Sequence, residues 1–201
     1  MTTGLIATSL CGVATLRTTL QDVYETLPVI DTAGLEKEAF SDGTTKIYDE
    51  SGKNITDSFA IKQRNPISYQ DIPPLIIAAF IAAEDKNFWK HNGVDYPSIL
   101  RAGIANIIHH KHEGGSGITQ QVVKNMIVGN SQTLDRKIRE ALLAMQIEKK
   151  ISKQKILEIY LNSIWFGHGA YGIGAASHAW FQKDLRDLSL AEIAFMAGLT
   201  R

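Results

Sequence analysis

The pattern of apolar and polar residues divides the chain near residue 65. Before this point the sequence is polar, and short alternating runs such as TTKIYD and NITDSF lie between glycines and asparagines. Such runs predict a hairpin or an extended linker. After residue 65, apolar residues recur at helical spacing in one segment after another. We therefore expect a mainly α-helical fold, with a linker and short β-hairpin over residues 21–64 and the principal domain over residues 65–201.

Capping residues, prolines and glycines set the expected bounds of the helices. The first helix should begin at residues 73–74, because proline is tolerated in the first turn, and Glu84 should lie near its C-terminal end. The glycine-rich stretch 114–117 should precede another helix, and Ser189 has capping-box spacing with Glu192 at the start of the last one. The remaining helices are expected over residues 97–110, 134–151, 153–165 and 174–181.

The N-terminal segment is apolar but short. Residues 1–16 carry no charged side chain, yet they are fewer than the roughly 20 apolar residues that span a bilayer, and they lack a basic n-region. Two interpretations stay open for residues 1–20: the remnant of a membrane anchor, or an ordinary N-terminal segment of the fold. The single cysteine, Cys11, excludes an intramolecular disulfide.

Charge is unevenly distributed along the chain. The formal net charge is zero, which gives no support to nucleic-acid binding, and we expect no nucleic-acid partner. Residues 22–64 carry nine acidic and five basic residues, whereas residues 114–155 carry eight basic and three acidic residues. The middle of the chain should therefore attract an anionic ligand, although a solvated helix face would produce the same asymmetry.

Two dense polar motifs carry candidate chemistry. EDKNFWKHNGVD, residues 84–95, places two carboxylates and a histidine beside aromatic residues, and apolar surroundings shift proton affinity. GGSGITQQVVKN, residues 114–125, brings amide and ammonium donors to the start of a helix, where they can hold an anion. Together the motifs indicate acid/base chemistry on a substrate that carries phosphate. Taken singly, Glu84 with Asp85 is equally a surface acid pair, and His91 equally a core or turn histidine.

Helical spacing gives the second motif a geometry. Gln120 and Lys124 are four residues apart, as are Gln121 and Asn125, so on a helix they form adjacent polar rows that suit a pyrophosphate. Arg136 and Glu140 repeat this spacing, which an intrahelical ion pair also explains. No group of histidine, cysteine and acidic residues has zinc spacing.

Five motifs in order give the chain a resemblance to a known family. The two motifs above are followed by RKIREALLAMQIE (136–148), ILEIYLNSIWFGHGAYGIGAA (156–176) and LSLAEIAFMAGL (188–199). From about residue 45 to residue 201 the chain resembles the peptidoglycan glycosyltransferase domain of glycosyltransferase family 51. This domain occurs in class A penicillin-binding proteins and in monofunctional transglycosylases. Five ordered motifs at matching intervals are highly specific.

The resemblance implies a fold, a reaction and a location. The fold would have a lysozyme-like head lobe and a smaller membrane-associated jaw lobe. The reaction would polymerise lipid II into glycan strands, with inversion at the donor sugar and undecaprenyl pyrophosphate as the leaving group. The catalytic domain would lie on the periplasmic or extracytoplasmic face of the plasma membrane. Its expected partners are lipid II, the nascent glycan strand, the membrane and a phosphoglycolipid inhibitor of the moenomycin type.

The resemblance also assigns roles to residues. Glu84 matches the general base, and Glu140 matches a second essential glutamate that orders the donor site or holds a divalent metal such as Mg or Mn. No organic cofactor is expected. The positions that match substrate-binding residues are Asp85, Ser116, Gln120, Gln121, Lys124, Asn125, Arg136 and Arg139.

The chain departs from the family pattern at two places. Ser116 and Gly117 stand where the family usually has Ser-Thr, and the loop 126–134 has no basic residue. Two other functions remain as alternatives. A lysozyme-like hydrolase or lytic enzyme would also use carboxylates, and a non-catalytic cell-wall binding module would need none.

Overall fold

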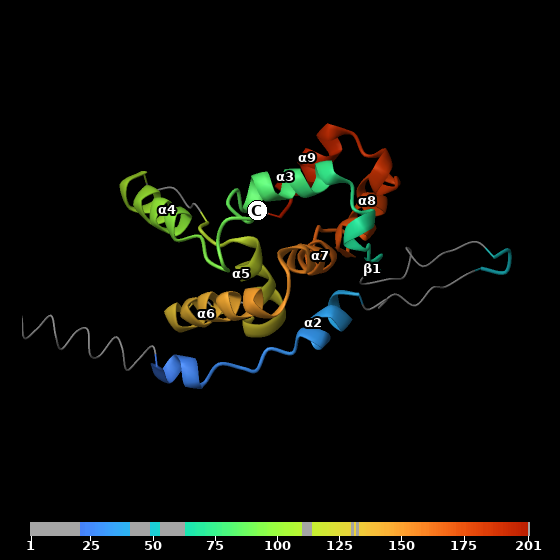
Figure 1. Ribbon diagram of the computed structural model, residues 1–201. Helices are drawn as coiled ribbons and strands as arrows, with labels where there is room; N and C mark the ends of the chain where they lie inside the picture. The colour runs from blue at the N-terminus through green and yellow to red at the C-terminus, as the bar shows by residue number, and fades with distance from the viewer. Residues whose placement is uncertain are drawn as a thin grey trace, which may run out of the picture.

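The computed structural model describes residues 21–40, 49–52, 63–109, 114–129, 131 and 133–200, with the backbone alone for 103–109. The described part of the chain is mainly helical, as the sequence predicts (Figure 1). Residues 1–20 and most of the predicted hairpin lie outside the described residues.

The structure confirms the predicted helices to within two residues. Side-chain caps begin several of them: Thr133, Ser152 and Ser189 each accept a hydrogen bond from the amide three residues later. One π-helical turn, Lys124–Val128, extends a shorter α-helix and is called η3. The helices are α3 (Pro74–Glu84), α4 (Tyr96–His109), α5 (Ile118–Val123), α6 (Leu134–Lys150), α7 (Lys153–Ser163), α8 (Ile173–Phe181) and α9 (Leu190–Gly198).

Residues 21–64, expected to be a linker with a short hairpin, contain helical residues that were not predicted, at 21–25 and in α2. Helix α2, Thr32–Ala39, lies within the segment expected to be a linker, and it packs on α7 with Leu35 buried. Asp31 caps it by accepting a hydrogen bond from the Gly34 amide at 2.9 Å. The helix is short and mostly polar, so its apolar spacing is too weak to distinguish it from a linker.

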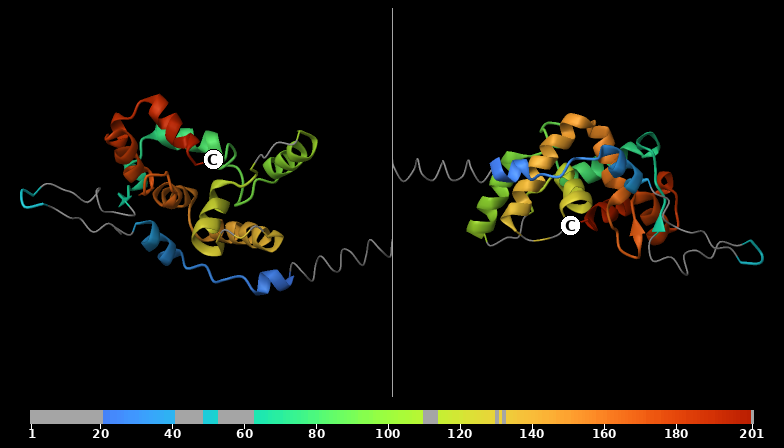
Figure 2. Two further views of the ribbon diagram at one scale, coloured as in Figure 1. Left: turned by 180° about the vertical axis from the view of Figure 1, so that it is seen from behind. Right: turned by 90° about the horizontal axis from the view of Figure 1, so that it is seen from below.

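Helix α7 forms the centre of the fold. Every residue from Ile156 to Asn162 is buried, and α2, α5 and α8 all pack against this helix (Figure 1). Helix α5 also packs on α6, while α9 packs along α3. The two further views in Figure 2 show the same arrangement around α7.

Two polar side chains of α7 hold the segment that leads into α3. Asn162 accepts a hydrogen bond from the Ile67 amide and donates one to the Ile67 carbonyl, both at 2.8 Å. Glu158 accepts a hydrogen bond from the Tyr69 amide at 2.7 Å. Nearby, the strand β1 (Gln63–Arg64) pairs in parallel with β2 (Ala170–Tyr171). These contacts fix the start of α3 and, through it, the position of Glu84 at its end.

Helix α4 stands apart from the other helices in Figure 1 and in the left view of Figure 2. At its first turn, the Tyr96 hydroxyl lies 3.4 Å from the sulfur of Met145 on α6. Tyr96, Ile99 and Leu100 expose apolar surface. No helix within the described ranges combines the length and the apolar character that crossing a membrane requires.

The loop between α3 and α4 packs tightly against α6. Gly93 has a φ of +94°, and a Cβ atom there would lie 2.6 Å from the carbonyl of Ala144. Phe88, in the same loop, is fully buried, and the ammonium of Lys153 lies 4.4 Å from the centre of its ring. The backbone of α6 cannot move aside without disturbing the core, so only glycine fits at position 93.

We predict that Gly93→Ala strongly destabilises the fold. The added methyl group meets rigid backbone in a left-handed conformation, which should lower the free energy of unfolding by about 3 kcal/mol. Gly52→Ala is the matched control, because Gly52 also has a positive φ, +80°, but open space around its Cβ position. The control should lose only about 1 kcal/mol. Urea denaturation of both variants measures the difference, and equal losses would contradict the packing argument.

Candidate active site

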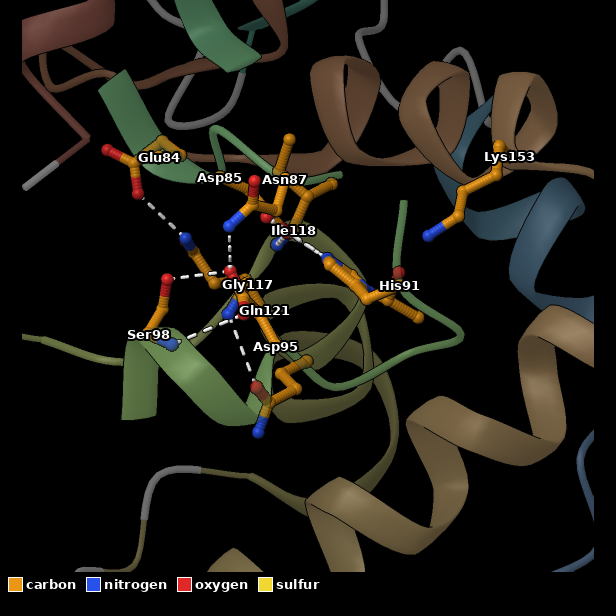
Figure 3. Close-up of polar contacts among 12 residues, drawn as sticks. Glu84, Asp85, Asn87, His91, Asp95, Ser98, Gly117, Ile118, Gln121 and Lys153 are labelled. Atoms are coloured by element: carbon orange, nitrogen blue, oxygen red, sulfur yellow. Dashed lines mark hydrogen bonds and ion pairs between the residues drawn. The ribbon is translucent and has the colours of Figure 1, made fainter. Parts of the chain in front are cut away.

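Helix α5 holds both of the predicted catalytic glutamates through neighbouring side chains. Gln121 donates a hydrogen bond to Glu84 at 2.7 Å, and Gln120 donates one to Glu140 at 3.2 Å. Glu84 ends α3, whereas Glu140 lies on α6. Adjacent residues on a helix point about 100° apart, so one short helix can contact carboxylates on two sides. Figure 3 shows the contact between Gln121 and Glu84.

Glu84 is partly buried and has two hydrogen-bond donors. Besides Gln121, the Thr200 hydroxyl lies 3.0 Å from its second carboxylate oxygen. The nearby Tyr160 is fully buried. Burial, followed by the charge of Glu84, raises the pKa of Tyr160 above its usual range, so this phenol stays neutral. The two donors to Glu84, Gln121 and Thr200, are themselves neutral, and part of the Glu84 side chain stays accessible.

Asp85 differs sharply from Glu84, because its side chain is only 1% exposed. Its two oxygens lie 3.0 Å and 2.9 Å from Nε2 of His91, and one of them accepts a hydrogen bond from the Ile118 amide at 3.0 Å. Both oxygens thus have partners within the protein (Figure 3). His91, which the sequence left open as a core or turn histidine, is a partner of Asp85.

The third carboxylate of the first motif, Asp95, caps helix α4 by accepting a hydrogen bond from the Ser98 amide at 3.2 Å. Asp95 accepts hydrogen bonds from Asn87 at 2.8 Å and from the Ser98 hydroxyl at 2.6 Å (Figure 3). Burial raises the pKa of Asp95, but these hydrogen bonds outweigh it and bring the pKa below its usual value. The resulting stabilisation is present above the unfolded-state pKa and is lost as the pH falls through the lower folded-state pKa.

Glu140 lies at the centre of a buried ionic cluster. Its side chain is 1% exposed, and one oxygen accepts a hydrogen bond from Arg136 at 3.0 Å. Lys137 contacts the other oxygen and also the Ser116 hydroxyl. Lys137 was not among the predicted site residues, although its spacing of three residues from Glu140 places both on one face of α6. The cluster joins the glycine-rich stretch to α6.

The other predicted site residues occupy different environments. Lys124 is partly buried at the start of the π-helical turn, and its ammonium has no polar partner within the described part of the chain. Asn125, the next residue, is exposed. Arg139 does not join the cluster: it pairs with Asp135 at 2.8 Å and donates to the carbonyl of Thr26 at 3.0 Å.

The surroundings of Glu140 do not fit a divalent metal. Among the described residues, no three histidine, cysteine, aspartate or glutamate side chains group together as metal ligands would. Arg136 and Lys137 already contact the Glu140 carboxylate, and a metal ion there would face two like charges.

Comparisons with known proteins agree on one family. The family model described as Transglycosylase matches residues 51–201. Penicillin-binding protein 1A of Pseudomonas aeruginosa is 47% identical over 158 residues, which cover 78% of this chain and 19% of the relative. Penicillin-binding protein 1A of Rickettsia felis is 46% identical over 161 residues, which cover 78% of this chain and 20% of that relative. Penicillin-binding protein 1F of Bacillus subtilis is 42% identical over 167 residues, which cover 83% of this chain and 23% of that relative. The chain therefore spans about a fifth of the length of these curated relatives.

We predict that Arg136 is important for stability and that Arg139 is not. Arg136→Met removes one of two cations from a buried carboxylate, which should lower the free energy of unfolding by about 3 kcal/mol. Arg139→Met, the control on the same helix, breaks a pair with the largely exposed Asp135 and should cost less than about 1 kcal/mol. Chemical denaturation of the two variants tests this. Equal stability of both variants would mean that the Glu140 cluster is not held as the structure shows.

Proposed function

This chain belongs to the transglycosylase family of peptidoglycan glycosyltransferases, and we propose that it polymerises lipid II into glycan strands. In this reaction the 4-hydroxyl of the acceptor sugar attacks the anomeric carbon of the donor. The bond to the lipid diphosphate breaks with inversion, and undecaprenyl diphosphate leaves. The observation that carries the proposal is that α5 holds Glu84 on one side and the Glu140 cluster on the other.

Glu84 is suited to act as the general base. Its carboxylate is oriented by Gln121 and Thr200, and it is only partly buried, so an acceptor hydroxyl can approach it. A sugar hydroxyl is a weak nucleophile at neutral pH. A carboxylate that removes its proton during attack typically accelerates such a step by about 10²- to 10⁴-fold.

The donor diphosphate requires positive charge instead of a second acid. Lys124 has an ammonium without a polar partner among the described residues, and Arg136 and Lys137 give the Glu140 cluster a net positive charge. Charge that develops on the leaving diphosphate is stabilised by such preorganised cations. We assign this task to the side chains, because the surroundings of Glu140 do not favour a divalent ion.

The same cluster argues against a lysozyme-like hydrolase. A glycosidase uses one carboxyl group as an acid that protonates the leaving oxygen. Here both oxygens of Glu140 accept hydrogen bonds from cationic side chains, and Asp85 is buried with its own partners. Glu84 is then the one accessible carboxylate of the three, whereas a glycosidase divides its acid and base or nucleophile roles between two carboxyl groups. A diphosphate leaves without that proton, so this arrangement favours transfer from a lipid diphosphate.

The membrane is the expected location of the substrate. Because a polyprenyl tail stays in the bilayer, the protein must reach the membrane surface. Tyr96, Ile99 and Leu100 expose apolar side chains on α4, the helix that stands apart, and an apolar groove of about 420 Å³ runs along α3 next to Trp89. We propose that α4 belongs to a jaw lobe at the extracytoplasmic surface of the plasma membrane, beside a lysozyme-like head lobe.

We predict that Glu84→Gln lowers the rate of lipid II polymerisation by about 10²-fold or more, since the amide cannot accept the proton. The fold and the affinity for lipid II should be retained, because glutamine keeps the shape of the side chain. Glu25→Gln is the control, since Glu25 is exposed and lies outside the site. Polymer formation from labelled lipid II measures the rates.

The alternatives give different results in the same assay. An unchanged rate in Glu84→Gln would remove Glu84 as the base. Release of soluble fragments from purified peptidoglycan, without polymer formation, would support the hydrolase. Binding of lipid II without turnover by the unmodified protein would support a non-catalytic module.

Lys124 provides a separate test of the donor site. Lys124→Gln should lower kcat/KM for lipid II by roughly 10²-fold, because one cation for the diphosphate is lost. It should also weaken binding of a phosphoglycolipid inhibitor of the moenomycin type. Lys149→Gln, an exposed position on α6, should change neither quantity. Equal effects of the two substitutions would show that only overall charge matters.

A further inference from the structure

Helix α5 has no side chain at its N-cap position, although the Gln120 side chain accepts a hydrogen bond from the Gly117 amide at 3.3 Å. The N-cap position is Gly117, which has no side chain, although serine, threonine, asparagine or aspartate usually stands there and accepts a hydrogen bond from the first turn. Instead, Asp85, which is 33 residues before Ile118 in the chain, accepts a hydrogen bond from the Ile118 amide at 3.0 Å. The first turn of α5 is therefore capped by a carboxylate of the first motif.

The missing side chain at position 117 makes room for this cap. A Cβ atom there would lie 2.3 Å from the carboxylate oxygen of Asp85 that binds Ile118, and 3.6 Å from Nε2 of His91. The backbone of Gly117 is extended, with φ −80° and ψ 176°, a conformation that any residue adopts. Space, and not backbone conformation, is what requires glycine at this position.

The Asp85 carboxylate is closed to a substrate by burial. Its side chain is 1% exposed, and its oxygens are occupied by His91 and by the Ile118 amide. A shift large enough to accommodate a side chain at position 117 would weaken at least one of these contacts, because hydrogen bonds require defined distances and angles.

The same helix holds the neighbouring residue. Glu84 accepts a hydrogen bond from Gln121, which lies four residues after Gly117 and one turn further along α5. Two consecutive acidic residues are thus attached to one helix, Asp85 at its first amide and Glu84 at a side chain in its second turn (Figure 3). Movement of Asp85 would displace the end of α3 and change how Glu84 meets Gln121.

We propose that Gly117 and Asp85 are a positioning pair: glycine leaves the space in which Asp85 caps α5, and this attachment sets the orientation of Glu84. The inference rests on the proposed function for its kinetic consequences, since it assumes that Glu84 is the base. It removes Asp85 from the substrate-binding residues and gives it a role within the protein.

The kinetic test compares two glycines of the same stretch. Gly117→Ala should lower kcat for lipid II polymerisation by about 10-fold to 100-fold, because small displacements of a catalytic group have effects of this size. KM should change less than threefold, since the cations around Glu140 are untouched. Gly114→Ala is the matched control, as nothing lies within 4 Å of its Cβ position. Its kcat should stay within twofold, and equal losses in both variants would overturn the proposal.

A double-mutant cycle isolates the contact with Asp85. In an Asp85→Ala background the carboxylate that meets the new methyl group is gone, so adding Gly117→Ala should change kcat and Tm little further. If Gly117→Ala has the same effect in both backgrounds, the glycine acts through something other than Asp85 and the proposal fails.

A spectroscopic measurement separates this inference from the proposed function. Nitrogen-15 NMR of the histidine rings reports the contact between His91 and Asp85, with the His91 signal identified by its loss in His91→Gln. Gly117→Ala should shift this signal and Gly114→Ala should not. The measurement needs no turnover. A shift of the His91 signal in a protein that does not polymerise lipid II would therefore refute the proposed function but support the positioning role of Gly117 and Asp85. An unchanged His91 signal in folded Gly117→Ala would refute the positioning role of Gly117 and Asp85, whatever the polymerisation rate.

Discussion

Helix α5 carries polar side chains into the interior, where each needs a hydrogen-bond partner because water cannot supply one. Thr119 and Gln120 are fully buried, and they bind Glu148 at 2.6 Å and Glu140 at 3.2 Å. These two glutamates are eight residues apart on α6, so they lie on the same face of that helix. The need to satisfy Thr119 and Gln120 therefore fixes α5 along α6, and Gln121 is left pointing toward α3.

A second set of buried polar contacts, made by α7, holds the segment before α3. Asn162 and Glu158 of α7 hold the backbone that leads into α3, and α3 ends at Glu84. Lys153, at the start of α7, donates to Glu148 at 2.7 Å and lies over the ring of Phe88. The position of Glu84 thus depends on α7 at the start of α3 and on α5 at its end. Rigid helices, and not loops, set the geometry of the base, as precise catalysis requires.

Local sequence signals predicted the helices well because caps and apolar spacing act over a few residues. The hydrogen-bond partners of the polar residues on α5 were harder to predict. Periodicity shows that Gln120 and Gln121 are adjacent, but not which side chain each one contacts. The partners of Lys137 and Arg139 could not be predicted from helical periodicity either. Both are cations near Glu140 in sequence, and only the packing of α6 places one in the cluster and the other against Thr26. Capping of α5 by a carboxylate from another motif leaves no local trace except an unexplained glycine.

The charges of the site explain why a buried glutamate is useful in a reaction that needs only one base. Arg136 and Lys137 carry two positive charges against the single negative charge of Glu140, and Lys124 adds a third cation nearby on the same chain segment as Gln120. Without Glu140, two buried or partly buried cations would repel each other and turn toward water. With it, they are held in place with an excess of positive charge, which an arriving diphosphate can neutralise. On this argument we propose that Glu140 orders the cations around the leaving group and that Glu84 alone exchanges a proton with the substrate.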